Sequence, residues 1–210
     1  MTDLATLTQA GGALALIGRT SAVGVGLIFA GAATGKLRHR ALFPGVVANY
    51  RMLPQGLVAP VAMILPWAEL GLGCALAGLG VSGMAGPALP LASASAIALL
   101  LVFAWAMAIN IARGRSHIDC GCGHSALRQP LGKPLVLRNI LLGLLLVPAS
   151  LPASTGLRAL PDAVPGAGWV ALGGGFALFL LFHLFNAILA LTAMAAPALL
   201  RFPRAEVQVR

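Results

Sequence analysis

The sequence predicts an all-α fold: a polytopic membrane helical bundle of about five transmembrane helices, in which residues 1–210 form one integral membrane domain. Only 9% of the residues are charged and 59% are hydrophobic, whereas a soluble domain carries about 25% charged residues. Between Leu57 and Ala112 the only formal charge is Glu69, and residues 163–200 contain none. Such runs are long enough for helices to cross about 30 Å of hydrocarbon. They lack the polar–apolar alternation of barrel strands.

Five apolar stretches follow one another along the chain. We expect spans at about 20–36, 57–79, 91–112, 134–152 and 168–196. Between the first two, Phe43, Val46, Val47, Tyr50 and Leu53 recur at helical spacing, which predicts a short helix lying flat at the membrane surface. The N-terminus lacks a basic region followed by a cleavable apolar core, so we expect no removable signal peptide and expect the first span to direct insertion.

The basic residues gather in alternate connecting segments. Four lie in the first loop, five in or beside the third and three in the tail, against none and one in the second and fourth: Lys36, Arg38, Arg40, Arg51; Arg113, Arg115, Arg128, Lys133, Arg138; Arg201, Arg204, Arg210. With five spans, the three basic segments share one side, which the positive-inside rule makes cytoplasmic. We therefore predict a multi-pass protein of the bacterial cytoplasmic (inner) membrane, with an external N-terminus and the lipid bilayer as its surroundings. The net charge of +9 then implies no nucleic-acid partner.

Small residues offer helix-packing sites. The chain contains 26 glycines, and Gly31 and Gly35 form a small-xxx-small pair that would let helices approach closely. We expect this pair to serve packing within the bundle.

The segment HIDCGCGH, residues 117–124, carries the sharpest chemical signal. Cys120 and Cys122 alternate with glycines, and a disulfide across so small a ring would be strained and easily reduced. Neighbouring basic side chains favour the thiolate, while Asp119 opposes it. We interpret the pair as a redox-active dithiol or disulfide. Cys74, within the second span, is most simply a small apolar residue.

Alternative interpretations of these residues stay open. Cys120 and Cys122, with His124 or His117, could hold a soft ion such as Cu(I) or Zn(II), as in a metal-handling membrane protein, or the two cysteines could carry no chemistry. A small-solute transporter or channel would instead use Glu69 and His183 at the bilayer midplane.

Polar residues within the spans predict an interior site. A carboxylate inside the bilayer is costly, so Glu69 should face the bundle and be paired or protonated. His183 and Asn186 share a helix face, and we predict that His183 approaches Glu69. Arg138 and Asn139, together with Asn110, should cluster near the basic membrane face. The contact between Glu69 and His183 could be a plain helix-packing hydrogen bond, a proton relay or part of a substrate site.

Four stretches together resemble a known family. They are GAATGKLRHRALFPGVVANYRMLP (31–54), LPWAEL (65–70), DCGCGH (119–124) and PLGKPLVLRNILL (130–142). In order and spacing the chain resembles the MauE family of methylamine-utilisation membrane proteins, within the DoxX-like group. The resemblance covers roughly residues 18–152, and the fifth span matches in character only.

The resemblance implies a role in maturing an exported, disulfide-rich protein, which for the family is the small subunit of methylamine dehydrogenase. It implies a thioredoxin-like partner, MauD, and the redox pair Cys120 and Cys122. The implied supporting residues are Lys36, Tyr50, Glu69, Asp119, Arg138 and Asn139. The sequence shows no second cysteine pair to complete an electron relay, so a quinone or a mobile partner would have to accept or supply the electrons. Whether the chain is itself a thiol–disulfide oxidoreductase or an accessory to one stays open.

Overall fold

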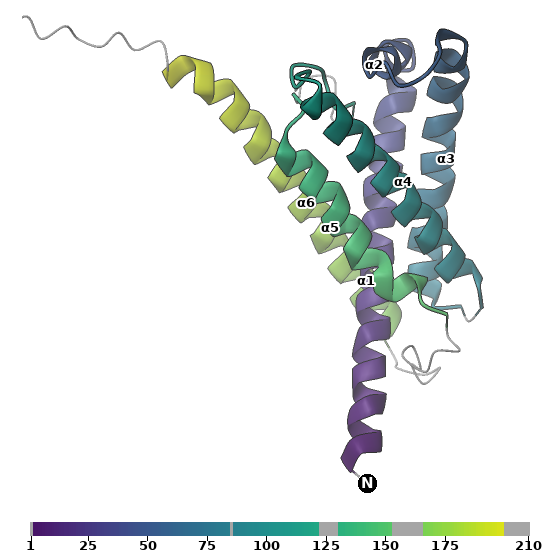
Figure 1. Cartoon of the computed structure of the whole chain (residues 1–210). Helices are drawn as coiled ribbons and strands as arrows, with labels where there is room; N and C mark the ends of the chain where they lie inside the picture. The colour runs from purple at the N-terminus through teal and green to yellow at the C-terminus, as the bar shows by residue number, and fades with distance from the viewer. Residues whose placement is uncertain (1, 85, 122–129, 153–165, 200–210) are drawn as a thin grey trace, which may run out of the picture.

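The regular secondary structure in the part of the chain that the structure describes consists of α-helices (Figure 1). The computed structural model describes residues 2–84, 86–121, 130–152 and 166–199, with side chains described between residues 11 and 192 of these ranges. The helices are α1 (Thr2–Arg38), α2 (Phe43–Asn49), α3 (Gln55–Ser82), α4 (Ala88–Ala112), α5 (Lys133–Ser150) and α6 (Ala167–Leu199). All but α2 contain a segment long and apolar enough to cross a membrane, which confirms the predicted all-α membrane bundle.

The candidate membrane segment of the first helix begins before the span predicted from about residue 20, and it includes Arg19. The candidate membrane segment of α1 runs from Gly11 to Arg38. Within it, Arg19 donates from Nε to the carbonyl of Gly80 (2.9 Å) and from Nη2 to that of Val81 (2.7 Å). The last carbonyls of a helix lack partners in their own helix. The guanidinium therefore satisfies the C-terminal end of α3 while α1 continues past it.

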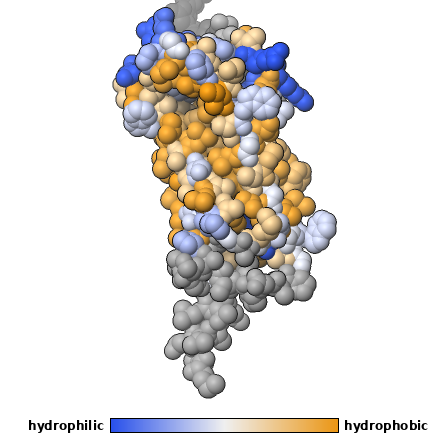
Figure 2. Space-filling model, turned by 90° about the vertical axis from the view of Figure 1, so that its right-hand side faces the viewer, coloured by the Kyte–Doolittle hydropathy of each residue, from blue (hydrophilic) through white to orange (hydrophobic). Residues whose placement is uncertain are grey.

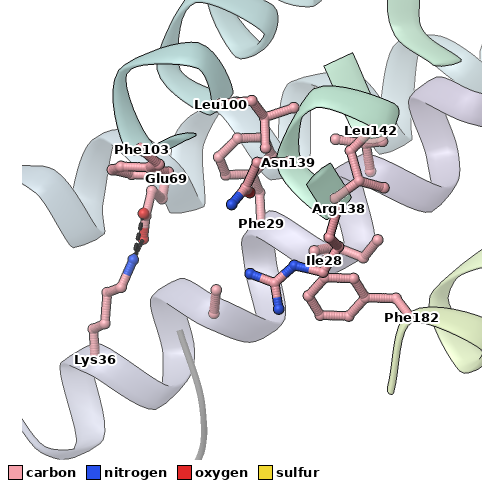
Figure 3. A pocket seen from close by; sticks show the side chains of 12 residues that line it. Ile28, Phe29, Lys36, Glu69, Leu100, Phe103, Arg138, Asn139, Leu142 and Phe182 are labelled. Atoms are coloured by element: carbon pink, nitrogen blue, oxygen red, sulfur yellow. Dashed lines mark hydrogen bonds and ion pairs between the residues drawn. The ribbon is translucent and has the colours of Figure 1, made fainter. Parts of the chain in front are cut away.

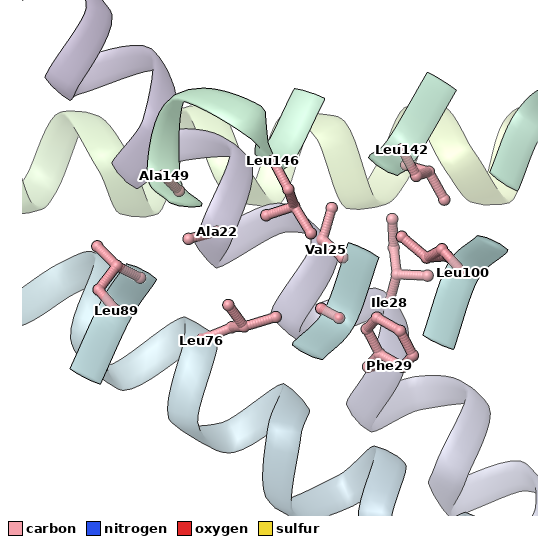
Figure 4. Packing of buried hydrophobic residues seen from close by; sticks show 11 residues of the cluster. Ala22, Val25, Ile28, Phe29, Leu76, Leu89, Leu100, Leu142, Leu146 and Ala149 are labelled. Atoms are coloured by element: carbon pink, nitrogen blue, oxygen red, sulfur yellow. The ribbon is translucent and has the colours of Figure 1, made fainter. Parts of the chain in front are cut away.

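Helix α1 runs through the middle of the bundle and packs against α3, α5 and α6 (Figure 1). Its side chains meet those of α3, α4 and α5 in the main apolar cluster (Figure 4), which comprises Ala22, Val25, Ile28, Phe29, Leu76, Leu89, Ala96, Leu100, Leu142, Leu146 and Ala149. Helices α1 and α3 approach each other closely at Gly26 and Gly73. A Cβ on Gly26 would lie 2.7 Å from the carbonyl oxygen of Gly73.

The predicted Gly31–Gly35 packing pair is not the site of this close approach. A Cβ on Gly35 would meet open space, and one on Gly31 would only touch the Phe179 ring at 3.5 Å. Helix α1 is rich in small residues on more than one face, so the small-xxx-small spacing identified a helix that packs tightly but not the glycines that permit it.

The connections with basic residues lie at one end of the bundle. In Figure 1 the α1–α3 segment with α2, the end of α4 and the start of α5 lie at the same end, and the α3–α4 connection, the end of α5 and the start of α6 lie at the other. Figure 2 shows an apolar surface between the ends, with hydrophilic residues gathered at the α2 end; Arg38, Arg40 and Arg51 are exposed there. The alternation predicted from charge is therefore present in the fold, while its orientation across the membrane stays a prediction.

Candidate functional site

The cysteine segment forms a loop whose neck is pinned by backbone hydrogen bonds. Asp119 and Pro130 form an antiparallel bridge, and the Leu131 N–H donates to the carbonyl of Ile118 (3.1 Å). Cys120 follows directly and is only 6% exposed, packed in an apolar cluster with Met107, Ile118, Leu131 and Leu135. Cys122 and His124 lie outside the described residues. These backbone contacts therefore hold Cys120, one of the two predicted redox cysteines, inside the protein.

Helix α2 covers this turn and holds it in place. The Tyr50 hydroxyl donates to the carbonyl of Cys120 (3.1 Å). Gly121 has φ +70°, a left-handed conformation that favours glycine. A Cβ there would also lie 2.8 Å from Cγ1 of Val46 on α2. Asp119 accepts a hydrogen bond from the Gly121 N–H (3.3 Å). Two predicted supporting residues, Tyr50 and Asp119, therefore act on the backbone of the cysteine turn.

A further residue, not singled out from the sequence, fastens α2 to the end of α4. Arg115 donates from Nη2 to the carbonyl of Asn49 (2.6 Å) and from Nη1 to Oδ1 of Asn110 (3.1 Å). Asn110 is fully buried. The sequence showed Arg115 only as one of a basic cluster, since its partners include backbone carbonyls that leave no pattern of residue types.

A buried ion pair lies close to α2 and the cysteine turn (Figure 3). Lys36 near the end of α1 donates to both carboxylate oxygens of Glu69 on α3, with Nζ 2.6 Å from Oε2. The side chains of Lys36 and Glu69 are 8% and 1% exposed. The lysine ammonium lies 5.5 Å from the Phe43 ring centroid and 5.3 Å from that of Phe103. The prediction that Glu69 faces the bundle is confirmed, with Lys36 as its partner.

Arg138 on α5 is the second buried cation of this region. It donates to Oδ1 of Asn186 on α6, and its guanidinium carbon lies 4.8 Å from the centroid of the Phe182 ring. Its neighbour Asn139 donates to the carbonyl of Leu135 (3.1 Å). Both Arg138 and Asn139 are buried. An arginine inside a membrane bundle must be held by polar and aromatic groups in this way, because its desolvation is costly.

These polar groups line one small cavity of about 40 Å³ between the helices (Figure 3). Lys36, Glu69, Arg138 and Asn139 contribute its polar wall. The remaining wall is apolar and comprises Val25, Ile28, Phe29, Ala32, Leu100, Phe103, Leu142 and Phe182. The fold thus brings together four of the predicted supporting residues from three helices.

The cavity and the cysteine turn are adjacent. Phe43 on α2 faces Lys36 and lies 3.9 Å from where a Gly121 Cβ would be. Leu135, which packs with Cys120, is one helical turn from Asn139. The predicted site residues therefore form two neighbouring groups, with α2 between the cysteine turn and the ion pair.

His183 has contacts that the sequence did not predict. Its ring lies edge-on to Phe179 (centroids 4.4 Å apart) and to Phe182 (5.6 Å), while Asn186 on the same face binds Arg138. The ion pair shown for Glu69 is with Lys36, so an approach of His183 to Glu69 stays a prediction.

The alternative interpretation is a metal site formed by Cys120 and Cys122 with His124 or His117. Among the described residues no three His, Cys, Asp or Glu side chains gather as metal ligands would. Cys122 and His124 lie outside the described residues, so the metal site stays a prediction. Cys74 is exposed on the membrane-facing side of α3.

Comparison with known proteins identifies relatives over most of the chain. The family model described as methylamine utilisation protein MauE matches residues 14–153. The chain is 43% identical to the methylamine utilization protein MauE of Methylorubrum extorquens, covering 72% of this chain and 73% of the relative. It is 42% identical to the MauE protein of Paracoccus denitrificans, covering 66% and 67% of the two chains, and 41% identical to that of Methylophilus methylotrophus, covering 61% and 65%. No solved structure matches the chain significantly.

Proposed function

Because this chain belongs to the MauE family of methylamine utilisation proteins, we propose that it is a thiol-redox protein of the bacterial cytoplasmic membrane. In this proposal it assists disulfide formation in an exported, disulfide-rich protein and works with a thioredoxin-like partner. By analogy with the family's implied role, the exported protein is the small subunit of methylamine dehydrogenase.

The observation that carries the proposal is the way Cys120 is held. Its neighbours fix the backbone on both sides, through Tyr50 and through the bridge at Asp119. A cysteine serving only as a small apolar residue needs no such support. Redox cysteines work as a defined pair, in which the position of one sulfur relative to the other sets how readily the bond exchanges.

The burial of Cys120 suggests that the two cysteines have different roles. A thiol must be reached by its partner's sulfur to exchange, and Cys120 is only 6% exposed. We therefore assign the attack on the partner to Cys122, and the release of the mixed disulfide to Cys120. Exchange moves two electrons and two protons: the chain's two thiols become a disulfide as the partner's disulfide becomes two thiols, or the reverse.

The transporter alternative gains less from the geometry. A transporter would need Glu69 to be accessible to a solute or a proton at the midplane. In the structure, however, this carboxylate forms a buried ion pair with Lys36. The ion pair instead packs against α2, because the Lys36 ammonium lies over the Phe43 ring.

Growth on methylamine tests the proposal. Cys120→Ser and Cys122→Ser, each introduced into a bacterium deleted for its own MauE protein, should fail to restore growth on methylamine while the membrane level of the protein is unchanged. Cys74→Ser is the matched control and should restore growth fully, because Cys74 is exposed on α3. Growth supported by both site variants would overturn the redox function.

A further inference from the structure

Arg138 is a buried cation, and the contacts that the structure describes for it do not neutralise its charge. Its residue is 7% exposed, and no carboxylate binds it within the described part of the chain. The one carboxylate on the cavity wall, Glu69, is already bound by Lys36. With two cations and one anion, the cavity wall has an excess of one positive charge. An uncompensated charge is expensive in a low-dielectric interior.

The guanidinium also has an unused hydrogen-bonding edge. Nη1 donates to Asn186, whereas Nε is buried without a hydrogen-bond partner among the described residues. No acceptor for Nη2 is seen there either. Nε and Nη2 form the two-donor edge that a carboxylate or phosphate accepts side-on. The oxygen pair of one anionic group could accept from both donors at once, one oxygen to each donor, which a single neutral oxygen could not do.

The surroundings of this edge suit the head of an amphiphile. The cavity of about 40 Å³ exceeds the roughly 10–15 Å³ that one water needs, which leaves room for an oxyanion. Its other walls are apolar: the Phe182 ring lies beside Arg138 (Figure 3), and Phe29 and Leu142 also line the cavity. Arg138 lies five residues after the start of α5, about 7.5 Å along the helix, so it is close to the membrane face.

We propose that this cavity binds the acidic head of an amphiphile, with a carboxylate or phosphate oxygen pair on the Nε–Nη2 edge of Arg138 and the hydrocarbon part along the apolar wall. An anionic phospholipid and a free fatty acid offer the same chemistry. The inference does not depend on the cysteine chemistry, so either proposal can fail alone.

The test uses the full-length protein, delipidated and placed in phosphatidylcholine nanodiscs. Phosphatidylglycerol is added in one arm and oleate in the other, and binding is followed by native mass spectrometry and by the shift in thermal midpoint. Binding in either arm, or in both, supports the site and identifies its source. Arg138→Gln should weaken it about tenfold or more, as expected when a charge-assisted hydrogen bond is lost.

Two further variants separate this site from general surface charge. Lys133→Gln removes the same charge from an exposed position five residues earlier on α5 and should leave the affinity within about twofold of wild type. Arg138→Lys, which keeps the buried charge but not the planar edge, should bind more weakly than wild type; it also provides the comparison if Arg138→Gln fails to fold. No binding to wild-type protein in either arm, or equal losses in Arg138→Lys and Lys133→Gln, would overturn the proposal.

Discussion

Single residues decide where the cysteine turn lies. Tyr50 fixes the carbonyl of Cys120, and the absent side chain of Gly121 leaves room for Val46. Tyr50 and Asp119 could be assigned a supporting role from the sequence only through the resemblance to a family, because a hydrogen bond to a backbone atom does not constrain the identity of the residue that carries that atom. Glu69 could be predicted directly, since a carboxylate among apolar residues must be paired.

Replacing Gly121 by alanine should loosen the cysteine turn for two reasons, the strained backbone conformation and a clash with a neighbouring side chain. Both Gly121 and Gly114 have a left-handed φ, +70° and +72°, which costs an alanine about 1–2 kcal/mol. Only Gly121 has a neighbour in the way, Val46. In protein with Cys120 as its sole cysteine, Gly121→Ala should therefore speed maleimide labelling of Cys120 several-fold, and Gly114→Ala should not.

Val46→Ala provides the converse test. Combined with Gly121→Ala it should restore most of the slow labelling, because it removes the methyl group that the new Cβ would strike. If the two glycine variants label Cys120 equally fast, the contact between α2 and the cysteine turn is not what protects this thiol.

At the scale of helices, buried polar groups join elements that apolar packing alone would not align. Arg19 ties α1 to the end of α3, the Lys36–Glu69 pair ties the other end of α1 to α3, and Arg138 with Asn186 joins α5 to α6. The helices themselves were predictable from length and hydropathy. These cross-links were not, because the sequence does not show which polar residue meets which.

Breaking the Lys36–Glu69 pair on one side should cost more than removing it entirely. Glu69→Gln leaves a buried, uncompensated lysine, which costs about 3–5 kcal/mol, and should lower the thermal midpoint in detergent markedly. The double variant Lys36→Met with Glu69→Leu replaces the pair by apolar groups of similar size and should be close to wild type. A double variant as unstable as Glu69→Gln would show that the charges themselves are required.

For the whole molecule, the sequence predicted the number of spans and their alternation, but not which helix lies in the middle. The central position of α1 follows from glycine contacts such as Gly26 with Gly73, which depend on the rotation of each helix. The sequence also could not predict the adjacency of the cysteine turn and the polar cavity, because it arises from α2 folding back over the end of α1.

The orientation predicted from charge can be measured with paired cysteines at opposite ends of the bundle. In a cysteine-free background, Ala41→Cys lies at the basic end and Met84→Cys at the other, and both positions are exposed. Because basic loops are retained in the cytoplasm, a membrane-impermeant maleimide should label Met84→Cys in intact cells. It should label Ala41→Cys only after the membrane is opened. The reverse pattern would place the cysteine turn outside the cell.

The most direct test of the proposed redox function is trapping of the mixed disulfide in cells that also produce the proposed thioredoxin-like partner. If Cys122 attacks and the buried Cys120 resolves, Cys120→Ser should accumulate a reductant-sensitive adduct through Cys122, whereas Cys122→Ser and Cys74→Ser should not. An adduct that forms equally in all three variants, or in none while the partner is oxidised normally, would contradict a redox role for the Cys120–Cys122 pair.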